Sequence, residues 1–409
     1  MAFDVKKGSF TCNISPGNQV ISGTGFTPKA LIFWTSLMTA EGFSVQNRGA
    51  IGLVVSTSAR RYYAWASNDA ADPTNVGGRS ADLAIGMLSA VSTVDGEADF
   101  VSFESNGFTL NWTDAPSSAW IVHYIALGGS DLTNVFLKTF NSEVLTGNKA
   151  YTGVGFLPDC LVSLGAHTGT TLPSTTATGL SPSIGFGLSS TARHVAGFGD
   201  QDNVATSNAA SYLYASRVLA IANMEDSENT LADIVSLDAD GFTLNYTSVI
   251  GSARPVAVLC LKGGQYKVGV ETQKTSGGTK ATTGVGFQPT GMLCIGADAV
   301  ADTLRQENGG RLVLGGASSG AEGTSWFNSQ DATGTAETDS STTTAKVLRH
   351  ATPPSTIDAE ADLSSFDSGG FTLDWTTADA TAREFAYLAF GSTAAGATVQ
   401  GGLTLIGVG

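Results

Sequence analysis

Serine, histidine and carboxylate side chains are the groups in this 409-residue chain that could act on a substrate. Ser318 lies in Gly316-Ala-Ser-Ser-Gly320, which matches the Gly-x-Ser-x-Gly pattern of a nucleophilic serine. That pattern requires a turn from a strand into a helix, with a histidine and an acid further along the chain. Here the surrounding stretch is rich in Gly and Ser, and His350 is the one histidine that follows. We therefore interpret Ser318 as a non-catalytic residue.

The four histidines lie far apart along the sequence: His123, His167, His194 and His350. Histidine side chains that share a metal ion or a proton-transfer step must come together, and this spacing gives no sign of that. We expect packed or solvated histidines, with no catalytic residue among them.

Two rows of alternating carboxylates are stronger candidates, because a pair of carboxylates can cleave a glycosidic bond. The rows consist of Asp95, Glu97 and Asp99, and of Asp358, Glu360 and Asp362. Between them in the chain, only Asp233 stands in a matching context. Alternate residues of a strand share one face, and such a row usually forms the solvent-exposed face of a sandwich. We expect exposed carboxylates; the alternative is a glycosidase that uses Glu97 or Glu360.

Oxygen-rich side chains follow an aromatic residue at three places. They are Asn68, Asp69 and Asp72 after Trp65, Asp200, Asp202 and Asn203 after Phe198, and Asn328 and Asp331 after Phe327. Such oxygens can hold Ca²⁺, and Asp200 with Asp202 is the best pair. Asp and Asn also build turns without metal. We predict turns, and we assign no metal or cofactor site.

Two phrases repeat at a fixed distance, and they define the elements that must position these residues. Gly-x-Gly-Phe-x-Pro occurs at 23–28, 153–158 and 284–289, with starts 130 and 131 residues apart. Gly-Phe-Thr-Leu-Asn/Asp-Trp/Tyr follows at 107–112, 241–246 and 370–375. The period exceeds the ~20–50 residues of a solenoid repeat and suits a self-sufficient domain. The sequence therefore predicts a triplicated domain.

Each repeat consists of short strand patterns separated by Gly, Pro, Asn, Asp and Ser, which is typical of all-β proteins. Ala30–Trp34 is a continuous apolar run that suits a buried strand, and alternation places Phe108, Leu110 and Trp112 on one face. We predict three tandem β-sandwich or jelly-roll-like domains, residues 1–130, 131–265 and 266–392. Residues 393–409 form an uncharged C-terminal tail, a candidate strand-exchange or docking segment.

The loops at 36–48, 167–183 and 298–308 differ most between the repeats. We expect them to face outward and to contact other subunits or a host, because distinct contacts are commonly grafted on one scaffold through its loops.

The composition excludes several classes of partner. Charged residues make up 14% of the chain, the net charge is −15, and no repeat has a basic stripe, so we expect no nucleic acid. No apolar run could span a membrane and no signal peptide precedes the first strand, so we expect synthesis in a host cytoplasm. The cysteines do not recur at matching places and are expected to be small core residues: Cys12, Cys160, Cys260 and Cys294.

Gly25-Phe-Thr-Pro-Lys-Ala-Leu-Ile-Phe-Trp34, the phrase at 107–112 and Tyr124-Ile-Ala-Leu-Gly-Gly129 together resemble repeat proteins encoded among the structural genes of tailed bacteriophages and prophages. This resemblance covers residues 1–392. A second resemblance is to H-type lectin domains, which are trimeric β-sandwiches with a similar early turn and late strand; it assigns no sugar-contacting residue here.

The first resemblance implies a non-enzymatic virion structural protein on the capsid or tail surface, as a decoration, collar or fibre-like component. Its expected partners are other virion proteins and copies of itself, as a trimer or a pseudo-trimer within one chain. The second implies the alternative, a multivalent carbohydrate-binding adhesin for host attachment through surface glycans. We expect Trp65 and loop 167–183 to contact sugar in that case.

Overall fold

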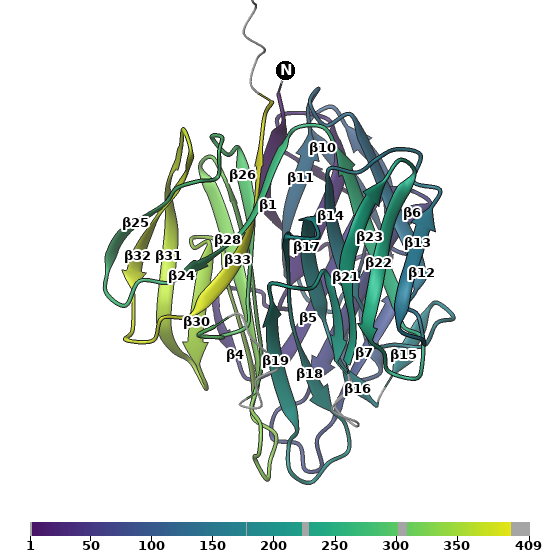
Figure 1. The fold of residues 1–409 in the computed structure, drawn as a ribbon. Helices are drawn as coiled ribbons and strands as arrows, with labels where there is room; N and C mark the ends of the chain where they lie inside the picture. The colour runs from purple at the N-terminus through teal and green to yellow at the C-terminus, as the bar shows by residue number, and fades with distance from the viewer. Residues whose placement is uncertain (1, 177, 223–228, 302–308, 394–409) are drawn as a thin grey trace, which may run out of the picture.

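The computed structural model describes residues 2–176, 178–222, 229–301 and 309–393, and every regular element in these residues is a β-strand (Figure 1). The predicted all-β class is confirmed. We call residues 1–130, 131–265 and 266–392 the first, second and third segment. The described part of each segment forms one large and one small antiparallel sheet.

The large sheets have seven strands each. The first has the order β1 (Asp4–Thr11), β11 (Ile121–Gly128), β3 (Pro28–Thr35), β5 (Asn47–Ser56), β6 (Ala59–Ser67), β7 (Val76–Ala81) and β15 (Ser174–Thr176). The second has β12 (Asn134–Asn141), β23 (Pro255–Lys262), β14 (Cys160–Gly165), β17 (Ser183–Ser189) and β18 (Ala192–Gln201), and β18 pairs with both β16 (Gly179–Leu180) and β19 (Ala209–Tyr214). The third has β24 (Gln265–Thr272), β33 (Glu384–Gly391), β26 (Gly291–Gly296), β27 (Gly310–Ser318), β28 (Ala321–Ser329), β29 (Thr338–Thr343) and β4 (Gly42–Ser44).

The small sheets have four strands each. The first has the order β2 (Gly17–Ser22), β10 (Gly107–Asp114), β9 (Thr93–Glu104) and β8 (Ile85–Ala90). The second has β13 (Gly147–Thr152), β22 (Gly241–Ser248), β21 (Asn229–Asp238) and β20 (Leu219–Ala222). The third has β25 (Gly278–Thr282), β32 (Gly370–Thr377), β31 (Thr356–Asp367) and β30 (Leu348–Thr352).

The two repeated phrases have backbone reasons for their glycines. Gly23 and Gly25 have φ angles of 97° and 83°, in the region that glycine tolerates best, and they turn the chain from β2 into β3. Gly107 begins β10, where a Cβ atom would lie 2.0 Å from the carbonyl oxygen of Ile21. At the equivalent Gly241 and Gly370, a Cβ atom would lie 2.0 Å and 1.8 Å from a backbone carbonyl oxygen.

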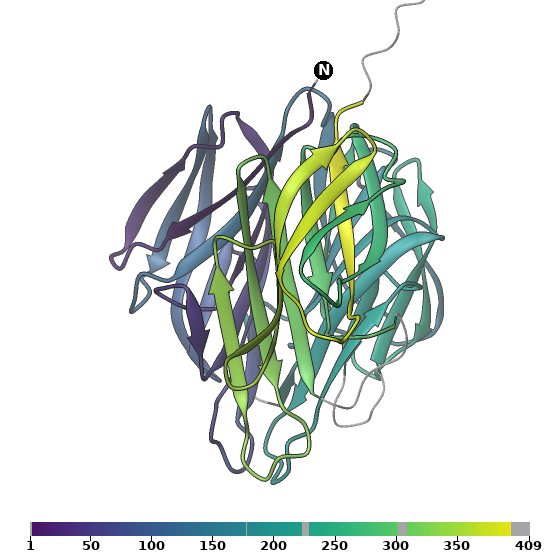
Figure 2. The ribbon, with the colours of Figure 1, turned by 90° about the vertical axis from the view of Figure 1, so that its left-hand side faces the viewer.

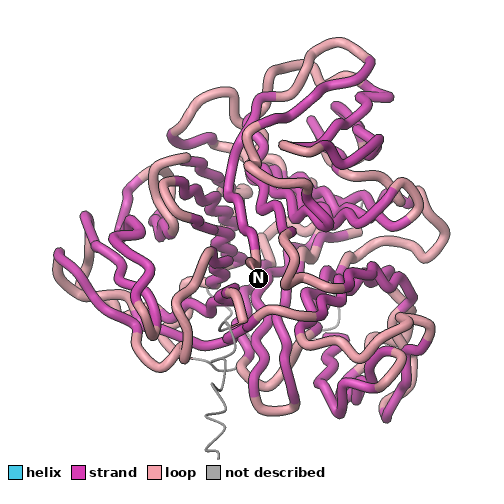
Figure 3. Tube along the Cα trace, turned by 90° about the horizontal axis from the view of Figure 1, so that it is seen from above, coloured by secondary structure: helices cyan, strands magenta, loops and turns pink. Residues whose placement is uncertain are grey.

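Each large sheet is buried on both faces. One face packs on its small sheet; in the first segment this core includes Phe33, Tyr62 and Phe108. The other face points to a central cluster that all three segments share, with members such as Ile32, Trp34, Ile51, Val162, Ile184, Leu293 and Ile295. Burial on both faces explains why the β3 sequence is continuously apolar and not alternating. Seen from above, the strands gather in three groups around this centre (Figure 3).

The three segments form a closed ring. The first strand of each segment packs against the large sheet of the segment before it: β12 against β5 and β6, β24 against β17 and β18, and β1 against β27 and β28. We call these the 2–1, 3–2 and 1–3 joints. The 1–3 joint connects segments that are not consecutive in the chain, and there Phe3 N donates to Ser392 Oγ at 2.8 Å.

Two short strands cross from one segment to the sheet of another. β15 of the second segment pairs with β7 of the first, and β4 of the first pairs with β29 of the third. Part of each of the variable loops 36–48 and 167–183 therefore forms a ladder pair inside the chain, while residues such as Glu41, Val45 and Thr171 are exposed. The expected contacts of these loops with other subunits or a host stay a prediction. In loop 298–308, residues 302–308 lie outside the described residues, as do residues 394–409 of the predicted tail.

Candidate functional site

Ser318 does not stand at a strand-to-helix turn. It ends β27 just before the hairpin into β28, and only 1% of it is exposed. Its Oγ accepts a hydrogen bond from the backbone N–H of Lys7 at 3.0 Å. The Ser318 side chain therefore contributes a hydrogen bond to the 1–3 joint.

The four histidines are separated in space as in sequence, and all are buried: His123 on β11, His167 after β14, His194 on β18 and His350 on β30. The His167 Nε2 atom lies 2.9 Å from Arg254 Nη2. Burial, and then the positive charge of Arg254, lower the pKa of His167 to about 4. A neutral ring beside an arginine suits packing better than proton transfer at neutral pH.

The prediction that the carboxylate rows are solvent-exposed is wrong. In the first row, Asp95 Oδ2 accepts from the indole N–H of Trp120 at 2.6 Å, and Glu97 pairs with Arg79 at 2.9 Å. Glu97 is also hydrogen-bonded to the Tyr62 hydroxyl, and burial is the main cause that raises the pKa of Tyr62. Asp95 is therefore buried, and the Glu97 side chain is mostly buried beside its arginine partner.

The third segment repeats this arrangement. Glu360 is 7% exposed and pairs with Arg349. Asp362 pairs with Lys346 at 2.8 Å, and Asp358 accepts from Arg383 at 3.0 Å. The remaining ion pairs at the matching position are Arg60–Asp99 and Arg193–Asp233. Each of these acids except Asp95, which accepts from Trp120, thus has a cation as its immediate partner, so no two of them are arranged around an open substrate site as a glycosidase pair would be.

Sequence reasoning missed one buried charged cluster, around Asp298. This residue is hydrogen-bonded to His350 Nδ1 and pairs with Arg311 Nη1 at 2.9 Å. Burial alone would raise the pKa of Asp298, but His350, Arg311 and Arg383 together hold it at about 2. Asp298 has a positive φ of 54°, like the equivalent Leu37, which places its side chain inward. The sequence feature that could have identified this cluster is the charged Asp298 at the place where the first segment has Leu37.

The three aromatic residues that precede the polar loops meet at the centre of the ring. Trp65 lies 4.9 Å from Phe327 and 6.2 Å from Phe198, measured between ring centroids, and all three are fully buried. The Trp65 indole N–H donates to Asn47 Oδ1 at 3.0 Å. Trp65 therefore cannot contact sugar as the adhesin alternative expects; its role is to pack the axis.

The polar loops beyond these aromatics bind one another, side by side at the lower end of the molecule (Figure 2). An aspartate in each loop accepts a backbone N–H from the large sheet of the segment before it in the ring: Asp69 from Thr338 at 3.0 Å, Asp202 from Val76 at 2.8 Å, and Asp331 from Ala209 at 3.0 Å. The following residue has a positive φ near 55° in all three loops (Ala70, Asn203 and Ala332). We call this arrangement the aspartate clasp.

Asp200 lies between the aromatic centre and the aspartate clasp. It is 2% exposed, and its Oδ2 accepts from Ser67 Oγ at 2.8 Å. Burial raises the pKa of Asp200 to about 6, although the hydroxyls of Ser329 and Ser67 oppose the increase. Among residues 2–393, leaving aside the undescribed 177, 223–228 and 302–308, no three His, Cys, Asp or Glu side chains are grouped so that they could hold a metal ion. The Asp200–Asp202 pair thus lacks further protein ligands of these types there.

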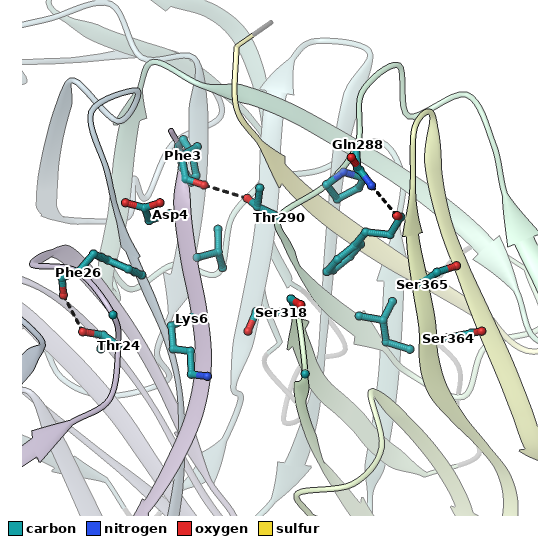
Figure 4. A pocket seen from close by; sticks show the side chains of 17 residues that line it. Phe3, Asp4, Lys6, Thr24, Phe26, Gln288, Thr290, Ser318, Ser364 and Ser365 are labelled. Carbon is teal, nitrogen blue, oxygen red and sulfur yellow. Dashed lines mark hydrogen bonds between the residues drawn. The ribbon is translucent and has the colours of Figure 1, made fainter. Parts of the chain in front are cut away.

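A groove of about 570 Å³ lies between the first and third segments, near the N-terminal end. Lys6, Thr24 and Phe26 line one wall, and Gln288, Ser318 and Ser365 line the other (Figure 4); Phe366 also lines the groove. Thr290 Oγ1 donates to Phe3 O across the upper end at 3.0 Å. Hydroxyls and two aromatic edges could receive a polar ligand, but no acid–base pair lines this groove except the adjacent Asp4 and Lys6.

The cysteine prediction is confirmed: all four are buried free thiols. The described residues contain no helix of the length and hydropathy needed to cross a membrane. No protein-family model matches this chain, and no curated protein sequence matches it.

Proposed function

We propose that this chain is a non-enzymatic structural protein of a tailed-phage virion, made in the host cytoplasm and carried on the capsid or tail surface. In this proposal the three segments are β-sandwich, jelly-roll-like domains that act as a pseudo-trimer. The chain would serve as a decoration, collar or fibre-like component, in contact with other virion proteins.

The observation that carries the proposal is the interlocking of the segments. β15 and β4 extend the sheets of other segments, and the aspartate clasp ties all three loops. Ring closure of this kind produces a rigid body with three similar outer faces, which suits assembly at a symmetric position better than catalysis.

The burial and bonding of the potentially reactive side chains support the same proposal. Ser318, the histidines and both carboxylate rows make buried contacts that hold sheets together. Enzymes keep such groups at an accessible site with matched pKa values. Here their partners are mostly cations or backbone groups of neighbouring strands.

Purified particles from a strain that encodes the chain provide the test. We expect mass spectrometry to find the chain at a fixed copy number per particle, and immunogold labelling to place it on the capsid or tail surface. A wash in 1 M salt, which shortens the Debye length roughly threefold relative to 0.1 M, removes chains that are only adsorbed by charge and leaves built-in chains in place. A chain that is absent from washed particles would overturn the proposal.

The groove favours one second candidate, a glycan-binding adhesin. Sugars bind through hydroxyl partners and through packing on aromatic rings, and the groove offers the exposed Ser319 and Ser364 beside Phe26 and Phe366. A glycan array with the full chain tests it, with Phe366→Ala as the groove variant and Val20→Ala as the exposed control. Binding that Phe366→Ala abolishes would support the adhesin; silence across host polysaccharides would exclude it.

A further inference from the structure

A polar cluster is buried at the 1–3 joint. Lys7, on β1, is 1% exposed, and its Nζ lies 2.7 Å from the carbonyl oxygen of Glu322 and 3.1 Å from His123 Nδ1. His123 Nε2 lies 2.7 Å from the Thr342 hydroxyl, and the His123 ring stacks on Trp34 with centroids 5.3 Å apart. The first segment thus inserts an amine and an imidazole into the third.

The other two joints have apolar side chains at these places. Strand register makes Lys7 the equivalent of Leu137 and Val268, because each is paired with the same position of the closing strand. His123 is likewise the equivalent of Ala257 and Ala386, two residues earlier on that strand. Leu137, Ala257, Val268 and Ala386 all belong to apolar clusters or are fully buried. Only the 1–3 joint carries the polar pair.

The surface of the third segment that faces Lys7 and His123 has a smaller residue than the matching surfaces of the other two segments. Gly323 is the third residue of β28, where the first and second segments have Arg61 and His194. A Cβ atom on Gly323 would lie 2.1 Å from Lys7 Nζ and 2.8 Å from His123 Nδ1, so a side chain there would exclude the polar pair. At the 2–1 joint the cation comes from the other side, because Arg61 Nη1 donates to Val256 O at 3.1 Å.

We propose that Lys7 and His123 select the Gly323 face of the third segment, over the faces of the first and second, as the partner of the first segment, and so fix the order in which the segments close the ring. A triplicated chain offers three similar faces, and a second copy offers three more, which invites exchange between chains. On the Arg61 face the polar pair would meet a bulky cation, and on the His194 face a second imidazole. Only the Gly323 face has both the space and the acceptors.

The hydrogen-bond partner of His123 also favours the face of the third segment. Thr342, the partner of His123, is the fifth residue of β29; its equivalents are Ser80 and Leu213. Leucine cannot satisfy an imidazole N–H, and an unsatisfied buried donor is costly. Burial lowers the pKa of Lys7 to about 7, with the charge of Glu322 acting against the decrease, so a misplaced Lys7 would be an unsatisfied amine as well. Size and charge therefore disfavour the Arg61 face, and size and hydrogen bonding disfavour the His194 face, which has Leu213.

The test compares the oligomeric state of the full chain after refolding from urea at low and high concentration, by size exclusion with light scattering. The Lys7→Leu/His123→Ala variant gives the first segment the side chains of the second. We expect the wild type to refold as a monomer, and this variant to form exchanged oligomers about tenfold more often, the change that one lost buried hydrogen bond brings. Lys6→Leu, on the same strand but half-buried, is the matched control.

A second variant tests the other side of the joint. Gly323→Arg should exclude Lys7 and open the ring, whereas Gly334→Arg, which meets nothing within 4 Å, should not. Adding Lys7→Leu and His123→Ala to Gly323→Arg recreates the 2–1 joint; we expect it to restore stability but to leave refolding unselective. If the first variant does not refold, the Gly323→Arg chains make the same test. Wild-type monomer yields from both Lys7→Leu/His123→Ala and Gly323→Arg would overturn the inference.

Discussion

Replacing Asp200 by asparagine is expected to stabilise the protein at neutral pH. The carboxyl is 2% exposed, and burial raises its pKa from 3.8 to about 6, with the negative charge of Asp202 as a smaller contribution. In the unfolded chain the same carboxyl loses its proton near pH 3.8. The difference of roughly two pKa units corresponds to about 3 kcal/mol at pH 7.

The direction in which the free energy of unfolding changes with pH follows from the number of protons bound by the folded and unfolded states. Between pH 3.8 and about 6 the folded protein holds a proton that the unfolded chain has lost, so stability falls as pH rises through this range. The asparagine variant has no such loss. Its amide oxygen can keep the Ser67 bond, and its N–H₂ group can donate to Ser329 Oγ.

Urea unfolding of the wild type and Asp200→Asn from pH 4 to 8 measures the difference. We expect the two proteins to be similar at pH 4, and the variant to gain about 2–3 kcal/mol by pH 7. The exposed Asp114→Asn serves as control. An equal difference at pH 4 and 7, or a less stable variant at pH 7, would refute the reasoning. So would calcium that stabilises the wild type but not the variant, because the carboxylate would then hold a cation.

Two further predictions use the same unfolding assay. Trp65→Ala should cost about 3–5 kcal/mol, because it empties the centre shared by three sheets, whereas the exposed Val20→Ala should stay within about 0.5 kcal/mol; equal effects would contradict the packing role. Asp298→Asn should remove a contribution of about 2 kcal/mol that is fully present above pH 4 and is lost as pH falls from 3.8 to about 2. A wild-type acid transition that is unchanged in the variant would exclude the charged cluster as its cause.

The strands inside each segment could be predicted because their signals are local. Phe108, Leu110 and Trp112 are almost fully buried, as two-residue alternation predicts. Gly107 is fixed by the carbonyl oxygen of Ile21, which belongs to the adjacent strand of the same small sheet. Turns that need glycine and strands with two-residue alternation are determined by a few neighbouring residues, so both can be predicted without knowledge of the rest of the fold.

The ring could not be predicted, because its contacts join distant residues. Nothing in Ser174–Thr176 identifies β7 as its partner about a hundred residues earlier. The carboxylate rows were misjudged for the same reason, since Arg79 and Arg349 lie on other strands. One sequence feature could have predicted the centre of the ring. An aromatic residue followed by an aspartate occurs at three matched positions, as expected for residues that meet at a three-fold axis.

The different residues at the places of Lys7, Leu137 and Val268 have an evolutionary consequence. In a trimer of identical chains every substitution appears at all contacts simultaneously, so a change must suit three sites or be lost. A single polypeptide is free of that constraint, and each contact can diverge alone while the other two preserve the architecture. Gene duplication followed by fusion thus converts a symmetric ancestor into a body whose sides can specialise one at a time.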